Sequence, residues 1–549
     1  MGSRIEIYDT TLRDGTQGEG ISLSASDKIK IARELDTLGV DYIEGGWPGS
    51  NPKDVEFFQR AAAMTWGHAT ICAFGSTRRA GSVAHADANL QALLDSAAPV
   101  LTLVCKSSVL HVREVLETTL PENLAMIGDS VAHLRGQGRR VIHDAEHFFD
   151  GFLLDPEYAL ATLRASLAAG AERLVLCDTN GGALTHQVAE ITRAVRAALD
   201  SAAPLGIHTH NDIELAVANT LAAVEAGAGH VQGTINGYGE RCGNANLCSI
   251  IPTLQLKMGY ECLPPENLRR LTNTAHMVAE VANAVLDNQK AYVGHSAFAH
   301  KGGIHVAAMR KTAHSYQHMD PTLVGNEQRV LISELSGRGN VLAKMDQGGL
   351  AGLGAAYRPD PQQAAAIVAQ IKDLESQGYQ FEGAEASVEL MIQRASPGYQ
   401  APFTLLDFLV VTERRGALDV LSEATVKVRV GDTVMHTAAD GDGPVNALDQ
   451  AMRKALIGFY PELSRVRLHD YKVRVVDGAA GTAAIVRVLI ESANERRSWT
   501  TVGSSPNIIV ASQQALSDAL AYAILEARGA GHGSPRPAEQ VALQAAAAR

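Results

Sequence analysis

Eight short apolar runs alternate with amphipathic helical stretches along the first part of the chain, up to about residue 270. The runs are Ile5–Tyr8, Tyr42–Gly45, Thr70–Phe74, Leu101–Cys105, Arg140–Ile142, Leu174–Cys177, Leu205–His208 and Val231–Ile235. Alternation of this kind is typical of an α/β protein whose parallel strands are connected by helices. Eight units in this length favour a (β/α)8 barrel, or TIM barrel, over an open doubly wound sheet.

Polar side chains follow the carboxyl end of every predicted strand. In chain order they are Asp9, Arg13 and Asp14; Glu44; Ser76; Lys106; Asp144 and Glu146; Asp178 and Thr179; His208 and His210; and Asn236, Glu240 and Asn244. An active site on a barrel draws on the carboxyl ends of many strands, whereas a doubly wound sheet gathers such groups at one crevice. The pattern therefore predicts a barrel with an active face, and hence an enzyme.

Two histidines at the end of the seventh predicted strand indicate a metal site. Side chains alternate along a strand, so His208 and His210 point the same way, roughly 6–7 Å apart. A His-x-His pair alone is more often structural, but here Asp14 and Asn244 belong to the same predicted barrel mouth. Two imidazoles and two oxygen donors suit Mg²⁺, Mn²⁺ or Zn²⁺, and the sequence does not choose among them. Open coordination positions would let an oxygen-chelating substrate bind the same ion.

Three further residues at this mouth offer chemistry, and each has a structural alternative. Arg13 beside Asp14 could stabilise an alkoxide on an attacked carbonyl or form a surface salt bridge; its place in the polar ring favours the former. Glu146 could act as an acid–base group or cap the next helix, with about equal weight. Thr179 could bind a carboxylate oxygen or form a turn.

Length and charge limit the other possibilities. A chain of 549 residues is too long for one hydrophobic core, so we expect two or more domains. A net charge of −12 argues against nucleic acid as a main partner. No apolar run approaches the roughly 18–20 residues that span a bilayer, and a strand follows the N-terminus too closely for a signal peptide. Six cysteines without C-x-x-C spacing indicate reduced thiols and a cytoplasmic protein.

The pattern predicts four parts: a TIM barrel over residues 1–270, helical linker subdomains over 271–396, a C-terminal domain over 397–528 and a disordered tail over 529–549. In the C-terminal domain, period-two alternation returns and three strands precede each of two helices. The strands are Leu405–Val411, Thr425–Val430, Thr433–Ala438, Arg467–Val476, Ala483–Ile490 and Ser498–Val502, and the helices are Pro444–Leu456 and Pro506–Leu525. This pattern indicates a duplicated βββα unit.

The start of the first of these helices is a candidate regulatory site. Asp442 and Gly443 lie where backbone N–H groups and the positive end of a helix dipole could bind an effector carboxylate. The alternative is a purely dimerising domain.

Four stretches of the sequence resemble one enzyme family. They are Asp9–Gln17, His208–Asp212, Gly239–Asn244 and Gly303–His305. They resemble the metal-dependent, Claisen-condensing barrel enzymes, a family that comprises α-isopropylmalate, homocitrate and citramalate synthases. The resemblance covers nearly the whole chain, including the duplicated C-terminal domain. Glu44–Asp54 and Asp144–Gly151 look most like the citramalate-forming branch, and Val306-Ala307 stands where the isopropylmalate enzymes carry Gln-Asp.

The resemblance implies roles for residues of this chain. The implied metal ligands are Asp14, His208, His210 and Asn244. The implied substrate-binding residues are Arg13, Gln17, Glu44 and Thr179. The implied catalytic residues are Arg13, Glu146, His305 and Tyr316. Arg13 would polarise the keto oxygen of a 2-oxo acid and Thr179 would hold its carboxylate. Glu146 and His305 would move protons, with Tyr316 assisting.

By the same resemblance, the substrates would be acetyl-CoA and pyruvate and the products (R)-citramalate and CoA, a step toward isoleucine by way of 2-oxobutanoate. A homodimer is expected because the linker of such enzymes reaches a second subunit. Isoleucine, with leucine as the second choice, would be the inhibitor. The alternatives are an α-isopropylmalate synthase that uses 2-oxoisovalerate, an acyl-CoA lyase or aldolase, and a catalytically silent amino-acid sensor.

Overall fold

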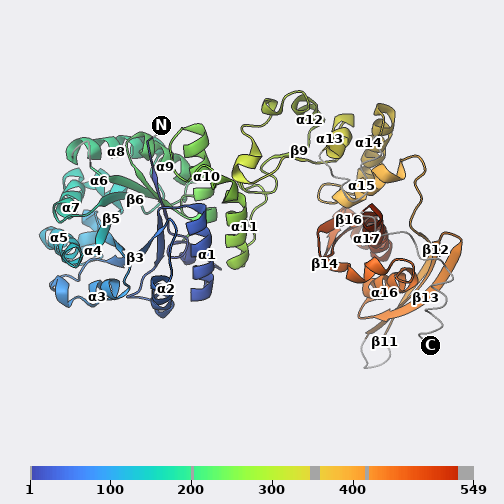
Figure 1. The fold of residues 1–549 in the computed structure, drawn as a ribbon, viewed down its shortest axis with the longest axis horizontal. Helices are drawn as coiled ribbons and strands as arrows, with labels where there is room; N and C mark the ends of the chain where they lie inside the picture. Colours follow the sequence, from blue (N-terminus) through green and yellow to red (C-terminus); the bar gives the residue numbers. More distant parts are fainter. Residues whose placement is uncertain (1–2, 200–202, 347–358, 415–419, 530–549) are drawn as a thin grey trace. The chain divides into compact units, whose positions relative to one another are not determined.

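The computed structural model describes residues 3–199, 203–346, 359–414 and 420–529, and the chain divides into two compact units (Figure 1). The first unit comprises Met1–Phe298 together with Asp320–Glu327. The second comprises Ala299–Met319 together with Gln328–Arg549. Each unit has its own hydrophobic core.

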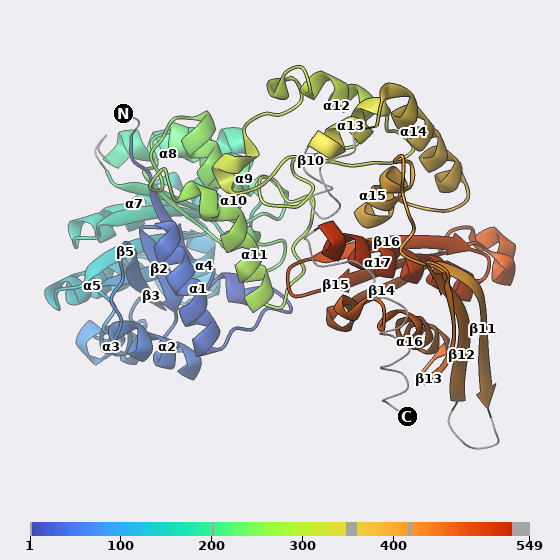
Figure 2. The same cartoon turned by 45° about the vertical axis from the view of Figure 1, so that its right-hand side comes forward.

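Eight parallel strands of the first unit close into a barrel (Figures 1 and 2). They are β1 (Glu6–Asp9), β2 (Tyr42–Gly46), β3 (Thr70–Ser76), β4 (Val100–Lys106), β5 (Arg140–Glu146), β6 (Arg173–Asp178), β7 (Leu205–Thr209) and β8 (His230–Gly233). Each strand pairs with the next in sequence, and β1 also pairs with β8, so that Asp9 lies beside Gly233. The predicted TIM barrel is confirmed, and β5 runs on to Glu146, beyond its predicted end.

Helices cover the outside of the barrel (Figure 2). They are α1 (Ala25–Leu38), α2 (Pro52–Ala62), α3 (Ala88–Asp95), α4 (Val109–Glu114), α5 (Leu120–Gly136), α6 (Phe148–Leu154), α7 (Pro156–Ala168), α8 (Thr185–Leu199), α9 (Ala216–Glu225), α10 (Leu247–Pro252) and α11 (Leu271–Val281). Local signals set their ends: Ser24 and Asp27 form a capping box at the start of α1, and Gly39 ends it with a φ of 96°.

A packed core of apolar and aromatic side chains fills part of the barrel interior. Tyr8 and Tyr42 lie with ring centroids 5.8 Å apart, and both contact the ring of His230. Cys72, Val100 and other side chains of the strands complete this cluster. Polar groups lie at both ends of the strands: Glu6 and Arg173 form an ion pair at the amino ends of β1 and β6, and a second set follows the carboxyl ends, where active sites of such barrels lie.

The second unit begins with short helices around a two-stranded parallel sheet. The sheet consists of β9 (Ala299–His300) and β10 (Arg329–Val330), and the helices are α12 (Gly303–Met309), α13 (Arg338–Asp346), α14 (Pro361–Ser376) and α15 (Glu385–Arg394). Ile367, Ile371 and Val388 form part of a common buried core for α14 and α15. This segment is mainly helical, as the sequence pattern indicates.

Two antiparallel three-stranded sheets, each followed by a helix, complete the second unit. The elements are β11 (Thr404–Arg414), β12 (Val420–Val430), β13 (Thr433–Gly441), α16 (Pro444–Leu456), β14 (Arg467–Val475), β15 (Val486–Ala493), β16 (Ser498–Ser505) and α17 (Ile508–Gly529). Alternate residues of β12, such as Val426 and Val428, are fully buried in the core that α16 covers. The predicted βββα duplication is confirmed.

Helix α17 is the one described helix that is long and apolar enough, by length and composition, to cross a membrane. It packs against β15 and β16, and 56% of its most apolar window is buried within the protein. Ala515, Leu516 and Tyr522 belong to the same core as the two sheets. Its apolar character is therefore explained by its place in this core.

The predicted boundaries at residues 270 and 396 stay predictions. The first unit runs on through α11 to Phe298, and the second combines the helical segment with the C-terminal domain. Of the predicted disordered tail, Gly529 ends α17, and residues 530–549 lie outside the described residues.

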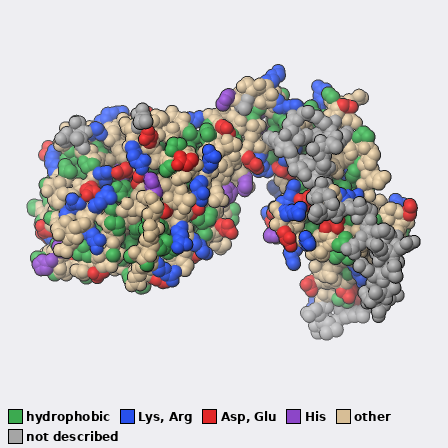
Figure 3. All heavy atoms as spheres, in the orientation of Figure 1, with side chains coloured by type: hydrophobic (Ala, Val, Ile, Leu, Met, Phe, Trp, Pro, Cys, Tyr) green, Lys and Arg blue, Asp and Glu red, His purple; other side chains and the backbone are tan. Residues whose placement is uncertain are grey.

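Charged side chains of both signs are mixed over the face of the molecule seen in Figure 3. Neither sign dominates the described residues there, although the chain as a whole carries a net charge of −12. This face therefore offers little long-range attraction to a polyanion.

His143 on β5 is fully buried, and within the described part of the chain neither of its ring nitrogens has a hydrogen-bond partner. Burial lowers the pKa of this imidazole to about 3. In the unfolded chain the pKa is near its ordinary value of about 6.5, so between these values the unfolded chain binds the additional proton. Stability contributed by neutral His143 is therefore complete above about pH 6.5 and is lost as the pH falls.

We expect His143→Leu to make the barrel less sensitive to acid. At pH 5 the native imidazole costs roughly 2 kcal/mol relative to pH 7, because each pH unit below 6.5 costs about 1.4 kcal/mol. Thermal unfolding of both proteins at pH 7 and pH 5 measures this difference. An equal loss of melting temperature in the two proteins would contradict the prediction.

Candidate metal centre and active site

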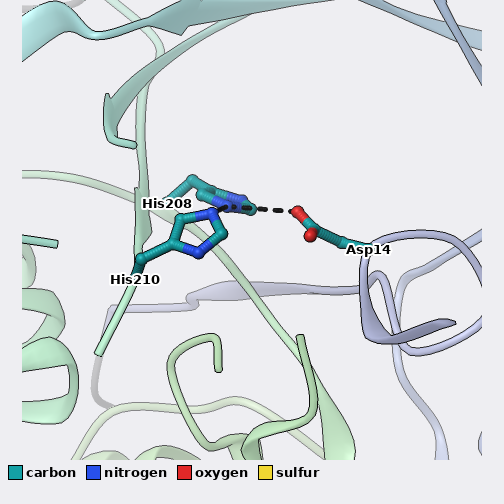
Figure 4. A group of neighbouring side chains, drawn as sticks. All are labelled: Asp14, His208 and His210. Atoms are coloured by element: carbon teal, nitrogen blue, oxygen red, sulfur yellow. Dashed lines mark hydrogen bonds and ion pairs between the residues drawn. The ribbon is translucent and has the colours of Figure 1, made fainter. Parts of the chain in front are cut away.

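Three side chains converge at the carboxyl-terminal mouth of the barrel (Figure 4). Asp14 follows β1, while His208 and His210 lie at the end of β7 and point the same way. Their donor atoms all lie within 4.8 Å of one another. Nε2 of His208 is 3.2 Å from Nε2 of His210 and 3.5 Å from Oδ2 of Asp14. The three residues, taken from distant parts of the sequence, could hold one metal ion.

The donor atoms are buried and short of partners. Oδ1 of Asp14, Nδ1 of His210 and Oδ1 of Asn244 are buried without a hydrogen-bond partner among the described residues. A buried polar atom without a partner is costly, and a bound cation would remove that cost for an oxygen. Asn244 is held nearby by a backbone bridge to His210. The set therefore fits a divalent cation.

Electrostatics prepare these groups for a cation. Burial by itself would raise the pKa of Asp14, but the nearby Arg13 and the two imidazoles outweigh this and hold it at about 2. Burial and the neighbouring His208 lower the pKa of His210 to about 4. At neutral pH the carboxylate is therefore ionised and the imidazole of His210 is neutral, which are the forms that bind metals.

The glycines after β8 let the loop pass close to Asn244. A Cβ atom at Gly239 would lie 2.2 Å from Nδ2 of Asn244, and a Cβ atom at Gly243 would lie 2.1 Å from the carbonyl oxygen of Gly237. Only residues without a side chain fit at these two positions. The glycine-rich stretch therefore places Asn244, a candidate metal ligand.

Arg13 is fixed from several sides. Its Nε donates to Oε2 of Glu44 at 2.6 Å, and its Nη1 lies 3.3 Å from Oδ2 of Asp14. Its guanidinium carbon lies 3.7 Å from the centre of the Phe74 ring. The predicted alternative of a surface salt bridge does not apply, because Arg13 is largely buried and turned into the barrel mouth.

Glu44 lies beside Arg13 and not in the cavity. Its side chain is fully buried and accepts hydrogen bonds from Tyr8, Thr10 and Arg13. No oxygen of Glu44 lines the cavity at the mouth. This geometry fits a group that positions Arg13 better than the predicted role in substrate binding.

A cavity of about 360 Å³ opens at the barrel mouth. It is lined by Arg13, Asp14, Gln17, Trp47, Phe74, Ser76, Val104, Lys106, Asp144, Glu146, Cys177, Thr179, His208, His210, Glu240 and Arg241. Seven of the residues predicted for the site thus share one cavity: Arg13, Asp14, Gln17, Glu146, Thr179, His208 and His210. The cavity is of the size that binds small molecules.

Thr179 lies in a turn after β6, where the N–H of Gly181 donates to the carbonyl oxygen of Asp178, so its predicted structural alternative is present. Glu146 does not cap the next helix, because the N-cap of α6 is His147. The Thr179 hydroxyl oxygen accepts the backbone N–H of His147 at 2.8 Å, so its own proton is left to donate into the cavity. Glu146 ends β5 and forms an ion pair with Lys106, which ends β4. Both members of this pair line the cavity.

Several side chains at the barrel mouth have no role predicted from the sequence. Trp47 and Phe74 supply apolar wall, and Lys106 pairs with Glu146. Gln232 on β8 hydrogen bonds to His208 and Asp144. The sequence offers one signal for Gln232: it is a polar residue within a strand whose residues are all buried.

Four predicted residues belong to the second unit. The rings of His305, on α12, and Tyr316 stack with centroids 4.1 Å apart. Asp442 and Gly443 immediately precede α16, where Asp442 N–H donates to Asn446. Their predicted roles in catalysis and regulation stay predictions.

Comparisons with known proteins agree over nearly the whole chain. Residues 4–278 match the HMGL-like family, residues 282–379 the homocitrate synthase post-HMGL domain-like family, and residues 382–524 the LeuA allosteric (dimerisation) domain. The (R)-citramalate synthase of Synechocystis sp. is 53% identical over 94% of this chain and 96% of its own. That of Geobacter sulfurreducens is 52% identical over 95% and 97%, respectively. The chain belongs to the (R)-citramalate synthase family.

Family membership settles the broad class of this protein. It is a biosynthetic transferase of the HMGL-like group, and the predicted enzyme is confirmed. The match of residues 382–524 supports allosteric regulation by the C-terminal domain and association of subunits.

The proposed ligand set can be tested by metal binding alone. Loss of a residue that only supports a metal ligand lowers metal affinity by ~10–100-fold. We expect Asp14→Asn and His210→Ala, which remove ligands themselves, to weaken Mn²⁺ binding by more than this. Glu146→Gln, which alters another carboxylate of the same cavity, is the control and should bind Mn²⁺ like the native protein. Isothermal titration calorimetry gives the affinity and stoichiometry. Unchanged Mn²⁺ affinity in Asp14→Asn would remove this residue from the ligand set.

Proposed function

We propose that this protein condenses acetyl-CoA with pyruvate and that water then cleaves the thioester of the product, which gives (R)-citramalate and CoA, a step toward isoleucine by way of 2-oxobutanoate. The observation that carries the proposal is 44–53% identity, over 94–96% of the chain, to five (R)-citramalate synthases. The cavity at the barrel mouth supports it, because it combines candidate metal donors, a buried arginine and a hydroxyl donor. A probable 2-isopropylmalate synthase of Methanopyrus kandleri is less similar, at 31% identity.

Asp14, His208 and His210 would hold a divalent cation, with the Asn244 oxygen as a further donor. A bound Mg²⁺, Mn²⁺ or Zn²⁺ would supply Lewis-acid stabilisation of negative charge on a substrate oxygen. The mixture of imidazole and oxygen donors suits all three ions, so the ion is chosen by availability and geometry.

Arg13 would donate to the keto oxygen of the 2-oxo acid. The oxygen gains negative charge when the carbonyl carbon is attacked, so the guanidinium binds the transition state more strongly than the ground state. Glu44 holds Nε of Arg13 and Asp14 lies beside Nη1, so Nη2 is the nitrogen that would donate to the substrate. Thr179, with Gln17 of the same cavity, would bind the carboxylate of the acid.

Glu146 and His305 would carry the protons, with Tyr316 assisting. Removing a proton from the acetyl methyl group gives an enolate, which must meet the keto carbon before it meets water. A base close to the methyl group and a cavity that excludes water both serve this step. Lys106 beside Glu146 keeps a positive charge next to the carboxylate that would take part.

The C-terminal domain would bind the feedback inhibitor, for which isoleucine is the first candidate and leucine the second. The start of α16 offers backbone N–H groups to a carboxylate, and Asp442 and Gly443 lie at this point. The match to an allosteric dimerisation domain supports both the regulation and a homodimer. A cytoplasmic location remains part of the proposal.

Release of free CoA separates the candidate functions. We expect acetyl-CoA with pyruvate to release thiol and form (R)-citramalate, with a kcat/KM at least ~10-fold above that for 2-oxoisovalerate, because apolar groups of a different size are discriminated by this much. Thiol release and chiral chromatography of the product measure both quantities. Preference for 2-oxoisovalerate would assign an isopropylmalate synthase, cleavage alone a lyase, and no reaction with any 2-oxo acid a sensor.

Loss of the proposed acid–base groups should affect turnover and leave metal binding in place. We expect Glu146→Gln and His305→Ala to lower kcat by ~10²–10⁴-fold, the usual contribution of general acid–base catalysis. Glu157→Gln on α7 and His314→Ala are matched controls, because both side chains are exposed and have no proposed role. Normal turnover in either test variant would remove that residue from its role.

A further inference from the structure

A chain of three buried side chains crosses the barrel interior behind the metal site. Gln232 on β8 is fully buried and lies between His208 on β7 and Asp144 on β5. Its Nε2 lies 2.9 Å from Oδ1 of Asp144, and its Oε1 lies 2.9 Å from Nδ1 of His208. His208 and Asp144 are also buried, with exposed fractions of 5% and 4%. Water therefore does not compete for these bonds.

The bond to Asp144 sets the direction of the glutamine amide. Oδ1 of Asp144 accepts the amide N–H whether the carboxyl group is ionised or carries a proton on its other oxygen. With Nε2 used in this way, the atom of Gln232 that faces His208 is the carbonyl oxygen, which can only accept. Nδ1 of His208 must therefore be the donor, and so it carries the ring proton.

The position of that proton decides what the other side of the ring can do. A neutral imidazole with its proton on Nδ1 has a lone pair on Nε2. Nε2 is the nitrogen that lies 3.5 Å from Oδ2 of Asp14 and 3.2 Å from Nε2 of His210. The reversed amide would place a proton on Nε2 and block a cation at this position.

We propose that Gln232, anchored by Asp144, is a positioning residue that fixes His208 in the form whose Nε2 is free to bind the metal ion. The inference rests on the proposed role of His208 as a ligand and is independent of the substrate. Partners of ligating imidazoles commonly fix the ring in this manner. Here the partner is an amide, and its direction is set in turn by a carboxyl group.

The two histidines of the site differ in this respect. Nδ1 of His210 is buried without a hydrogen-bond partner in the described part of the chain, so no amide or carboxyl group fixes its ring proton. His208 is prepared before a cation arrives, whereas His210 adapts when it binds. Loss of Gln232 should therefore act through His208 alone.

The first variant removes the acceptor. Gln232→Met keeps the length of the side chain but cannot accept from Nδ1, so His208 no longer has a fixed proton position. We expect the Kd for Mn²⁺ to rise by ~10–100-fold, the range measured for partners of this kind. His208→Ala should weaken binding more, and combining it with Gln232→Met should add nothing. Calorimetric titration of the full-length protein with Mn²⁺ alone at pH 7.5 measures these values.

The second variant rebuilds the chain with its two end groups exchanged. In Asp144→Asn combined with Gln232→Glu, the new amide donates to the new carboxylate, which accepts from Nδ1 of His208. The bond between residues 144 and 232 is reversed, but Nδ1 of His208 still donates to residue 232 and the side-chain volumes hardly change, so Mn²⁺ affinity should return to within about threefold of the native value. A merely structural role for Gln232 would not be rescued by exchanging the chemistry of the pair.

The outcomes separate this inference from the metal proposal on which it rests. Native affinity in Gln232→Met, or failure of the folded exchanged pair to restore binding, would overturn the positioning role. Native protein that binds no Mn²⁺, or His208→Ala that binds it normally, would instead overturn the ligand role of His208. If Gln232→Met does not fold, Gln232→Asn replaces it, and its shorter side chain, unable to span both partners, should lose affinity to the same degree.

Discussion

Closure of the barrel between β1 and β8 is the constraint on which the candidate site depends. Asp14 follows β1, His208 belongs to β7 and Asn244 follows β8, so these donors come from opposite ends of the first unit. An open sheet would leave β1 and β8 without each other as neighbours and would separate the donors. Because the strands are parallel, closure also brings their carboxyl ends to one face, where polar side chains line a common cavity.

Burial at this face then controls the charge of each carboxyl group. Asp14 lies beside Arg13 and two imidazoles, and its pKa is held at about 2. Asp144 is also buried, but Arg13 is shared with Glu44 and Asp14, and the pKa of Asp144 is raised to about 8, chiefly by burial and then by Glu44. One mouth therefore holds an ionised carboxylate that can bind a cation and a second carboxyl group that is mostly neutral at pH 7. The difference arises because Arg13 and two imidazoles surround Asp14, whereas Glu44 adds to the effect of burial at Asp144.

The range of each interaction, local or across the barrel, decides whether it can be predicted from the sequence. The periodicity of apolar residues gives the strands, and the residue after each strand gives the mouth, so Asp14, Thr179 and His210 could be found without a structure. Glu44 and Gln232 act through contacts across the barrel, and these depend on strand neighbours and side-chain rotamers that no local pattern records. The sequence pattern also ends β5 too early, because the polar residues at the end of this strand interrupt its apolar run.

The division of the chain into two units has a chemical consequence for the proposed reaction. The barrel contains the residues that would bind the 2-oxo acid, and also Glu146, one of the two proposed proton carriers. His305 and Tyr316 belong to the second unit. A condensing enzyme gains from such a division, because an enolate formed without its partner would be lost to water. The regulatory domain lies in the same unit as His305, and α14 and α15 share a buried core with Val502 of β16. If His305 has its proposed role, an effector that alters this domain would act on His305 and not on the metal ligands, and inhibition would lower turnover while the barrel keeps its affinity for the cation.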